Sequence, residues 1–279
     1  MFDMPTPEAE SDTGQTVTTD SPYSSLNACP MQCITNAVSN DLMANTLLAC
    51  GASPAMAHAA TEVEDFVGIA SALLINVGTL SPDWVESMKL AAKAACRLGK
   101  VWVLDPVGCG ATPYRSQVCR ELLELRPNIV RGNASEIMAL AGVTSSIKGV
   151  DSTAQSNEAL EAGQALATEF GCVVGISGAV DLVTDGRRVL HVANGVPMLQ
   201  QITASGCSVT ALAAAFACLF PQEPLEATAH ALAYFGLAGE LAARDAKGPG
   251  SLRVGLLDNL WTLSEEEVLG CVKLTEGRT

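Results

Sequence analysis

The sequence lacks the residues and patterns that build zinc clusters, secretion signals and membrane spans. Histidine occurs only three times in 279 residues and no two of the ten cysteines have C-x-x-C spacing, so a zinc site is not expected. No apolar run reaches membrane-spanning length, and the first residues lack the basic start and apolar core of a secretion signal. These absences, with cysteines scattered through apolar runs, predict a cytoplasmic protein with reduced thiols.

Positive charge is also scarce, because 16 Lys and Arg face 30 Asp and Glu and give a net charge of −14. This balance argues against nucleic acid and anionic membranes as partners. It does not argue against ATP, since a few local donors and a metal ion can bind phosphate on an acidic protein. No G-x-G-x-x-G follows the first predicted strand, which argues against a dinucleotide-binding oxidoreductase.

Hydrophobic residues make up 48% of the chain, enough for a sizeable core. Residues 1–25 are rich in Ser, Thr, Pro and acidic residues, which predicts a disordered tail. No repeat or internal linker interrupts the rest, so we expect one domain over residues 26–279.

Short apolar strands alternate with helical patterns along this domain. We expect strands at 33–35, 72–76, 101–104, 128–130 and 172–176, a hairpin over 181–190 that turns at 185–186, and helices at 41–49, 81–98, from 134, 154–170, from 207, and as a pair over 225–261. The alternation predicts an α/β fold with a mostly parallel central sheet and helices on both faces.

Polar residues follow several of these strands, at the positions Asn76, Asp105, Arg131 and Ser177. Ligands of open parallel sheets bind beyond the carboxyl ends of the strands. Arg131 at the end of a buried strand needs a nearby anion, and phosphate suits its fork. Asp105 precedes a proline, so a simple turn explains it equally well.

The sequence allows two roles for Glu136. Residues 133–136 have the spacing of a capping box, so Glu136 can cap the following helix. Asp105 and Glu136 together could also hold Mg²⁺ through its waters, and the two roles of Glu136 are compatible.

A small-residue turn opens directly into a long apolar helix near residue 205. Ala204, Ser205 and Gly206 let the backbone approach a ligand closely, and the first helical N–H groups and the helix dipole favour an anion there. Cys207 sits at the helix start, where its thiolate would be favoured. An anion cradle beside an ionisable group suits phosphoryl transfer to a hydroxyl, although such turns are common and cysteine is often only a packing residue.

The ordered motifs of this chain resemble those of the hydroxyethylthiazole kinase family, a thiamine-pathway member of the ribokinase-like superfamily. The resemblance covers nearly everything from residue 33 to about residue 258. The matching segments are 33–36, 44–48, 51–58, 76–80, 104–108, 110–115, 131–136, 148–152 and 206–207. It implies a three-layer ribokinase-like sandwich.

The resemblance also implies an activity. This is ATP-dependent phosphorylation of the hydroxyethyl group of 4-methyl-5-(2-hydroxyethyl)thiazole, which feeds thiamine synthesis or salvage. Mg²⁺ and a homotrimer with the thiazole site between subunits are implied with it.

Residue roles follow by position from the same resemblance. Met56, Asn36 and Ala204 would line the thiazole site, and Asp105 and Glu136 would serve the metal. The implied ATP-binding residues are Arg131, Ser177, Ser205 and Gly206. Cys207 would stand where most of the superfamily has an aspartate base, and it would act with Arg131 in catalysis.

Three positions depart from the family pattern. The usual Gly-Thr-Gly-Cys is here Ala204-Ser-Gly-Cys207, and a positive φ at Ala204 would be strained. Ser177 stands where Thr is frequent, and Gln32 where His is frequent.

Two alternatives stay open. One is a kinase of another small alcohol, such as a pyrimidine or vitamin precursor. The other is a non-catalytic binding protein, against which the joint presence of Asp105, Arg131, Glu136 and Cys207 argues.

Overall fold

The computed structural model describes residues 29–143 and 152–277. The predicted tail over residues 1–25 and most of the 148–152 motif lie outside the described residues. Within them, no helix is both long and apolar enough to cross a membrane.

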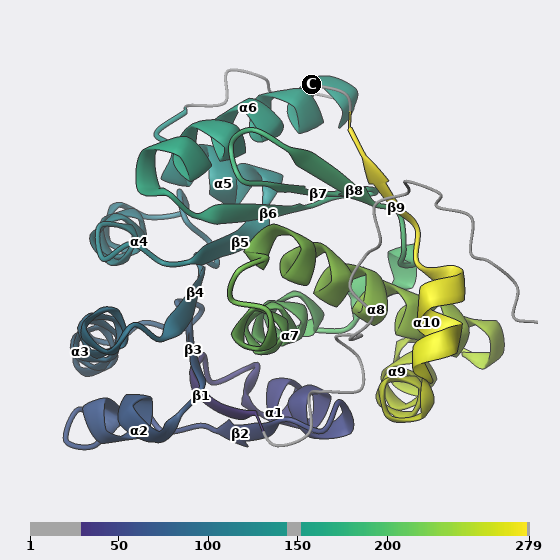
Figure 1. Cartoon of the computed structure of the whole chain (residues 1–279), viewed down its shortest axis with the longest axis horizontal. Coiled ribbons are helices and arrows are strands. Elements are labelled where there is room, and N and C mark those ends of the chain that lie inside the picture. The colour runs from purple at the N-terminus through teal and green to yellow at the C-terminus, as the bar shows by residue number, and fades with distance from the viewer. Residues whose placement is uncertain (1–28, 144–151, 278–279) are drawn as a thin grey trace, which may run out of the picture.

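A nine-stranded sheet forms the middle of the described structure, in the order β2-β1-β3-β4-β5-β6-β7-β8-β9 (Figure 1). The strands are β1 Pro30–Ile34, β2 Ser53–Ala55, β3 Ala72–Asn76, β4 Val101–Asp105, β5 Ile129–Asn133, β6 Val173–Ser177, β7 Asp181–Thr184, β8 Val189–Val192 and β9 Leu274–Glu276. The first six are mutually parallel, and β7, β8 and β9 follow beyond β6, each antiparallel to the strand before it. The predicted mostly parallel sheet is confirmed.

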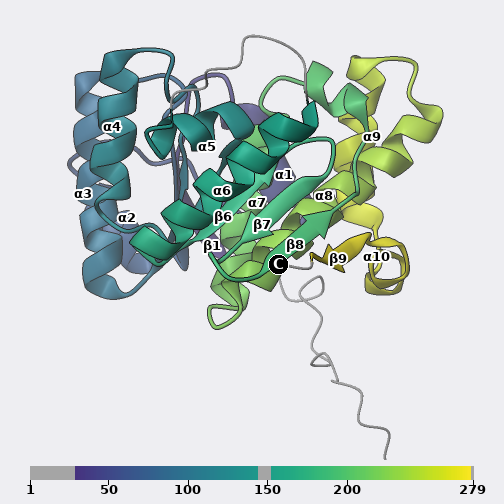
Figure 2. The same ribbon diagram turned by 90° about the horizontal axis from the view of Figure 1, so that it is seen from above.

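Helices cover both faces of this sheet, which gives the predicted three layers (Figures 1 and 2). On one face lie α2 Val63–Ile69, α3 Pro82–Leu98, α4 Pro113–Leu123, α5 Ala134–Leu140 and α6 Ser152–Phe170. On the other lie α1 Asn40–Ala49, α7 Ser205–Leu219, α8 Pro224–Asp245, α9 Pro249–Thr262 and the short α10 Glu265–Cys271, with a 3₁₀ turn at Pro197–Gln201 before α7.

The burial of the central strands explains their sequence. In β3, Leu73 and Ile75 pack into the core beneath α2–α6, whereas Ala72 and Leu74 pack into the core beneath α1, α7, α8 and α9. A strand covered on both faces needs apolar residues at every position rather than at alternate ones. Burial of each such Leu or Ile contributes roughly 1.5–3 kcal/mol.

Two helix starts form as the sequence predicts. The Ser81 hydroxyl accepts a hydrogen bond from the Trp84 amide at 3.3 Å, Pro82 occupies the first helical position of α3, and the helix ends at Gly99 with φ 64°. Asn133 and Glu136 form a reciprocal capping box at the start of α5. These caps satisfy backbone donors that the helix itself cannot.

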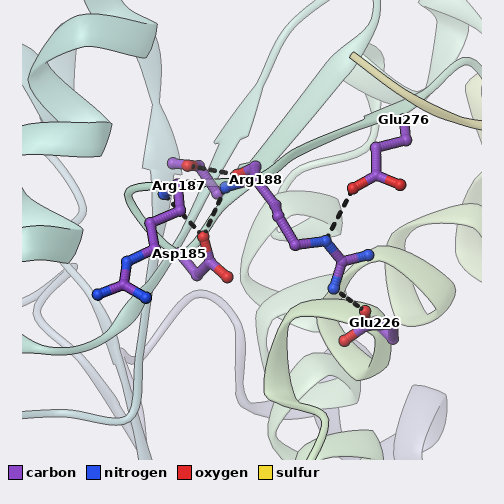
Figure 3. Close-up of polar contacts among 6 residues, drawn as sticks. Asp185, Arg187, Arg188, Glu226 and Glu276 are labelled. Atoms are coloured by element: carbon purple, nitrogen blue, oxygen red, sulfur yellow. Dashed lines mark hydrogen bonds and ion pairs between the residues drawn. The ribbon is translucent and has the colours of Figure 1, made fainter. Parts of the chain in front are cut away.

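The β7–β8 hairpin turns at residues 185–186, as predicted. The Asp185 Oδ1 accepts from the amides of Arg187 and Arg188 at 2.8 and 2.7 Å, and Gly186 has φ 91°. The Arg188 guanidinium then reaches Glu226 on α8 and Glu276 on β9 (Figure 3). These ion pairs join three elements at the surface, and because they are exposed each contributes at most about 1 kcal/mol.

Candidate functional site

A cavity of about 660 Å³ lies where the carboxyl ends of β4, β5 and β6 meet the start of α7. It is lined by eight of the ten residues to which the resemblance gives a role, namely Asp105, Arg131, Glu136, Ser177, Ala204, Ser205, Gly206 and Cys207. Asn36 and Met56 are not among the lining residues. The topology therefore gathers residues that are up to 102 positions apart in the chain, which is the separation between Asp105 and Cys207.

The turn into α7 has the geometry of an anion cradle. Ala204 adopts φ 66° and ψ 5°, and α7 begins at the next residue. The described residues offer no hydrogen-bond acceptor to the backbone amides of Gly206 and Cys207, so both donors are available at the cavity. A side chain at Gly206 would meet the Arg131 Nη1 at 3.1 Å, so the guanidinium lies directly against this backbone.

The left-handed conformation of Ala204 yields a stability prediction. Because the Cβ of a non-glycine residue is strained there, Ala204→Gly is expected to raise the free energy of unfolding by about 1 kcal/mol. Denaturant unfolding of the purified variant measures this. Ala213→Gly, a buried position inside α7, is the matched control and should lose about 1 kcal/mol or more. An Ala204→Gly protein no more stable than the parent would show that position 204 is unstrained.

A chain of hydrogen bonds links Cys207 to Asp105 through two buried asparagines. The Asn36 Nδ2 lies 2.7 Å from the Asn76 Oδ1 and 3.6 Å from the Cys207 Sγ. The Asn76 Nδ2 in turn donates to the Asp105 Oδ2 at 2.7 Å. Asn76 and Asp105 are register partners at the ends of β3 and β4, so strand pairing places them side by side.

The orientation of the Asn36 side-chain amide sets the direction of these hydrogen bonds. The Asn36 Oδ1 accepts from the backbone amides of Val38 and Ser39, each at 3.0 Å, which turns its amide nitrogen toward Asn76 and Cys207. A side chain at Gly78 would collide with the Asn36 Nδ2 at 2.5 Å. The loop after β3 therefore needs glycine there for the asparagine pair to form.

Arg131 is the cation of the cavity. Its side chain is 8% exposed, its Nη1 donates to the Gly206 carbonyl at 2.9 Å, and its Nε has no partner among the described residues. Burial raises the pKa values of Asp105 and Asp181 and the charge of Arg131 opposes that rise, yet neither carboxylate lies within ion-pair distance of it in the described residues. The guanidinium thus retains unused donors, which fits the predicted need for an anion.

Asp181 was missed from the sequence. It lines the cavity from the first position of β7, and its Oδ1 accepts from the Gly178 amide at 2.8 Å. Burial raises its pKa, against the opposing effects of Arg131 and that amide. The sequence does contain a signal for Asp181 as a site residue. It lies two residues after the Ser177-Gly178-Ala179 turn, at the start of the hairpin.

Asp105 carries an unusual carboxyl group. Burial raises its pKa to about 7, and the nearby Glu136 adds to the rise, whereas Arg131, Thr210 and Asn76 oppose it. A buried carboxyl of this kind gains from a cation that would replace the lost solvation.

Glu136 forms the capping box and also holds the loop after β4. Its Oε2 accepts from the Asn133 amide and its Oε1 from the Gly108 amide, both at 2.8 Å. Each oxygen keeps a lone pair, so capping leaves the carboxylate able to bind further at the cavity.

Arg115 braces the same loop and was also missed as a site residue. It lies in the first turn of α4, at the end of the matching segment 110–115, and its guanidinium donates to the carbonyls of Val77, Val107 and Gly78. These carbonyls belong to the loops after β3 and β4, so Arg115 joins the two loops that follow Asn76 and Asp105.

The acidity predicted for Cys207 is wrong. The sequence predicts a thiol pKa lowered by the helix start, but burial, with a smaller contribution from the charge of Asp105, raises the pKa to about 11. Hydrogen bonds from Asn76 and Asn36 and the charge of Arg131 oppose this rise without cancelling it. Partial desolvation beside a carboxylate outweighs the favourable helix end.

Ser177 and Met56 occupy different surroundings. The Ser177 hydroxyl lines the cavity and donates to the Gly132 carbonyl at 3.3 Å. Met56 follows β2, the edge strand, and packs half-buried against the core on the α1 side. It shares the carboxyl edge of the sheet with Asn36 but lies outside the cavity itself.

The described residues contain no cluster of three or more His, Cys, Asp or Glu side chains that could hold a metal ion. Mg²⁺ commonly uses only one or two carboxylates together with waters and substrate phosphates, and Asp105 with Glu136 provides such hard oxygen ligands.

A nine-stranded, mainly parallel sheet between two helical layers, with its cavity at the start of α7, defines the ribokinase-like fold. A ribokinase-like superfamily protein from Enterococcus faecalis has this fold, with a TM-score of 0.59 at 12% identity over 88% of this chain and 90% of that one.

The family is also defined. Residues 27–266 match the model of the hydroxyethylthiazole kinase family, and the chain belongs to that family. A hydroxyethylthiazole kinase from Zea mays is 54% identical over 249 residues, 88% of each chain. The structure of a hydroxyethylthiazole kinase protein from Pyrococcus horikoshii has a TM-score of 0.83 at 41% identity and covers 92% of this chain and 96% of its own.

Proposed function

We propose that this protein transfers the terminal phosphoryl group of ATP to the hydroxyl of 4-methyl-5-(2-hydroxyethyl)thiazole, in thiamine synthesis or salvage. The observation that carries the proposal is the start of α7, where two free backbone amides, the Arg131 guanidinium and the Cys207 thiol face one cavity. Its family supplies the substrate class, because the relatives are named for this reaction.

The phosphates of ATP bind at the cradle in this proposal. The amides of Gly206 and Cys207 donate to the terminal phosphate, and Arg131 and the Ser177 hydroxyl contact phosphate oxygens. Bound phosphate supplies the acceptors that the Arg131 Nε lacks. Ser205 contributes at the same helix start, although its hydroxyl already donates to the Leu199 carbonyl at 2.9 Å. Because the transition state of phosphoryl transfer is loose, positioning and charge neutralisation dominate.

Asp105 and Glu136 are the residues that would hold Mg²⁺. Their carboxylates line the same cavity, and burial of Asp105 leaves a carboxyl that gains from a cation. The ion, when bound, neutralises charge on the phosphate oxygens. Asn76 fixes the Asp105 Oδ2 by its hydrogen bond, so it orients this carboxylate rather than binding substrate.

The thiazole ring would lie between Cys207 and Met56, with Asn36 and Ala204 beside it. Asn36 contacts the thiol, and Met56 lies at the same sheet edge outside the cavity. A homotrimer that closes the thiazole site between subunits is consistent with this open edge, where Val38 is 58% exposed. The ten cysteines are all free, which supports a cytoplasmic location for the protein.

Cys207 positions the substrate hydroxyl in this mechanism. With its pKa raised to about 11, the group is a neutral thiol at pH 7 and serves as a hydrogen-bonding neighbour rather than as the modest base that the sequence indicates. A loose transition state makes a strong base unnecessary.

Substitutions of Cys207 test this role. Cys207→Ala is expected to lower kcat by roughly 10- to 100-fold, with little change in the Kd of nucleotide. Cys207→Ser and Cys207→Asp should remain active, because each keeps a polar group beside the hydroxyl. Steady-state kinetics and nucleotide titration give both quantities. Unchanged turnover in Cys207→Ala would remove Cys207 from the chemistry, and total inactivity of a folded Cys207→Asp would argue against a group acting on the hydroxyl.

The proposed function itself is tested by incubating purified protein with ATP, Mg²⁺ and the thiazole alcohol. The expected product is the phosphate ester, detected by mass spectrometry together with ADP. A panel of other small alcohols, including pyrimidine and vitamin precursors, is the control. Nucleotide binding without any ester would indicate a non-catalytic protein, and a preferred ester of another alcohol would correct the substrate.

A further inference from the structure

Two cysteines meet at the edge of the sheet opposite the cavity. Cys29 lies directly before β1, Cys218 lies in the last turn of α7, and their sulphur atoms are 3.2 Å apart although 189 positions separate them in the chain. The other ends of these two elements lead to Asn36 and to Cys207, which lines the cavity. The thiol pair is therefore remote from the proposed chemistry.

We propose that Cys29 and Cys218 form an oxidisable dithiol, a modification site that peroxide converts reversibly into an intramolecular disulfide. The geometry requires little movement, because a disulfide bond of about 2.05 Å is reached when the sulphurs approach by roughly 1.2 Å. Cys29 is 4% exposed and Cys218 is half-buried, so Cys218 is the sulphur that a small oxidant reaches first.

The surroundings of Cys218 favour this order. Its pKa is lowered to about 7, first by a hydrogen bond from Cys29 and also by Ser71 and the charge of Lys100, against the effect of burial. The pKa of Cys29 is raised by the same contact, so Cys29 retains the proton. Cys218 is thus the nucleophile, and Cys29 is the resolving thiol.

The chemistry balances with hydrogen peroxide as the oxidant. The Cys218 thiolate attacks one peroxide oxygen, the O–O bond breaks, and the departing hydroxide takes a proton to leave as water. The resulting sulfenic acid is attacked by the Cys29 sulphur, which forms the S–S bond and expels a second water. Two thiols lose two electrons and two protons to one peroxide, and an added dithiol reverses the step.

Other cysteines lack this arrangement. Cys96 and Cys271 are exposed, and the Cys96 thiol donates to the Leu125 carbonyl at 3.0 Å. Cys109 and Cys119 share a hydrogen bond that raises the pKa of Cys119, but they are only 6% and 0% exposed. The Cys29–Cys218 pair combines a short sulphur contact with a reachable sulphur.

The disulfide would link the last turn of α7 covalently to the residue before β1. A cross-link over so long a segment restricts the unfolded chain strongly, so the oxidised protein should be more stable. The two elements already pack in one core, so closure needs no rearrangement at the cavity. Turnover should stay within about two-fold after oxidation.

The test treats the full chain with one equivalent of hydrogen peroxide, blocks remaining thiols, and maps peptides by mass spectrometry. A linked Cys29–Cys218 peptide is expected, with a rise in Tm of about 5 °C or more that dithiothreitol reverses. Cys218→Ser and Cys29→Ser should lose both effects, and the control Cys271→Ser should keep both.

Three results would overturn the proposal. They are alkylation of both Cys29 and Cys218 after peroxide treatment, a Cys109–Cys119 link as the main product, or an undiminished Tm rise in Cys218→Ser. Peptide mapping of the parent protein needs no variant to fold. It also does not depend on the substrate of the enzyme, so it is independent of the proposed function.

Discussion

Replacing Arg131 by methionine is expected to lower kcat/KM by about 1,000-fold or more, because a cation that neutralises transition-state charge in phosphoryl transfer contributes on that scale. Arg131 is the buried cation of the cavity, its Nη1 donates to the Gly206 carbonyl, and its Nε has no partner among the described residues. Methionine keeps much of the aliphatic volume but removes both the charge and the donors. Steady-state kinetics with ATP and the thiazole alcohol measure the loss.

Two companion variants make the Arg131 result specific. Arg131→Lys keeps a charge but not the planar fork, so its activity should lie between parent and Arg131→Met. Arg187→Met removes an exposed arginine on the β7–β8 turn (Figure 3). Arg187 does not line the cavity, so kcat/KM should be unchanged. If Arg131→Met retained parental kcat/KM, the phosphates would have to bind elsewhere.

Replacing Asp105 by asparagine is expected to have two effects: it should inactivate the enzyme and it should stabilise the fold. Loss of the proposed metal-binding carboxylate should lower kcat/KM by about 1,000-fold. The stability gain follows from burial, which raises the Asp105 pKa from 3.8 to about 7 in the folded protein. A charged carboxylate at this position costs folding free energy that neutral asparagine does not.

The sign of the pH dependence follows from proton counts. Between pH 4 and pH 7 the folded Asp105 holds more protons than the unfolded one, so its contribution to stability falls as pH rises through this window and levels off above pH 7. The gain from Asp105→Asn should therefore be small near pH 4 and reach a few kcal/mol at pH 8. Denaturant unfolding at both pH values, in the absence of Mg²⁺, measures it.

Asp185→Asn is the matched control for this prediction. The Asp185 carboxylate accepts two backbone amides in the hairpin turn, so its replacement should cost stability rather than increase it. An Asp105→Asn protein that is less stable than the parent at pH 8, or equally active, would contradict the account of this carboxyl.

The sequence predicts the central sheet well because burial on both faces leaves a clear pattern. β3 and β4 read as continuous apolar runs that end in Asn76 and Asp105, and parallel pairing then brings those two residues together in register. Helix α7 was equally predictable, since its small-residue start and long apolar body leave few other structures possible. The strained φ of Ala204 was also anticipated from the missing glycine.

The sequence reasoning missed two elements for different reasons. β9 has three residues, Leu274–Glu276, and becomes a strand only because β8 offers an unpaired edge. α4 was overlooked although Thr112 caps it, Pro113 begins it, and Val118 and Leu122 are spaced for a buried face. That signal was present in the sequence, whereas that of β9 was not.

The errors at the site share a physical origin. The pKa of Cys207 depends on burial and on Asp105, which is 102 positions away in the chain. Neither influence can be recognised from the helix start alone. Asp181 and Arg115 act through contacts with distant loops, with Gly178 in one case and Val77 in the other. Electrostatics and loop bracing are properties of the assembled fold.

The central claim is that the start of α7 grips the terminal phosphate of ATP beside Cys207. A crystal structure with Mg²⁺ and a non-hydrolysable ATP analogue tests it most directly. The account predicts the terminal phosphate within hydrogen-bond distance of the Gly206 and Cys207 amides, with the Arg131 guanidinium turned toward it. Phosphates bound away from that helix start, or an Arg131 that faces away from them, would contradict it.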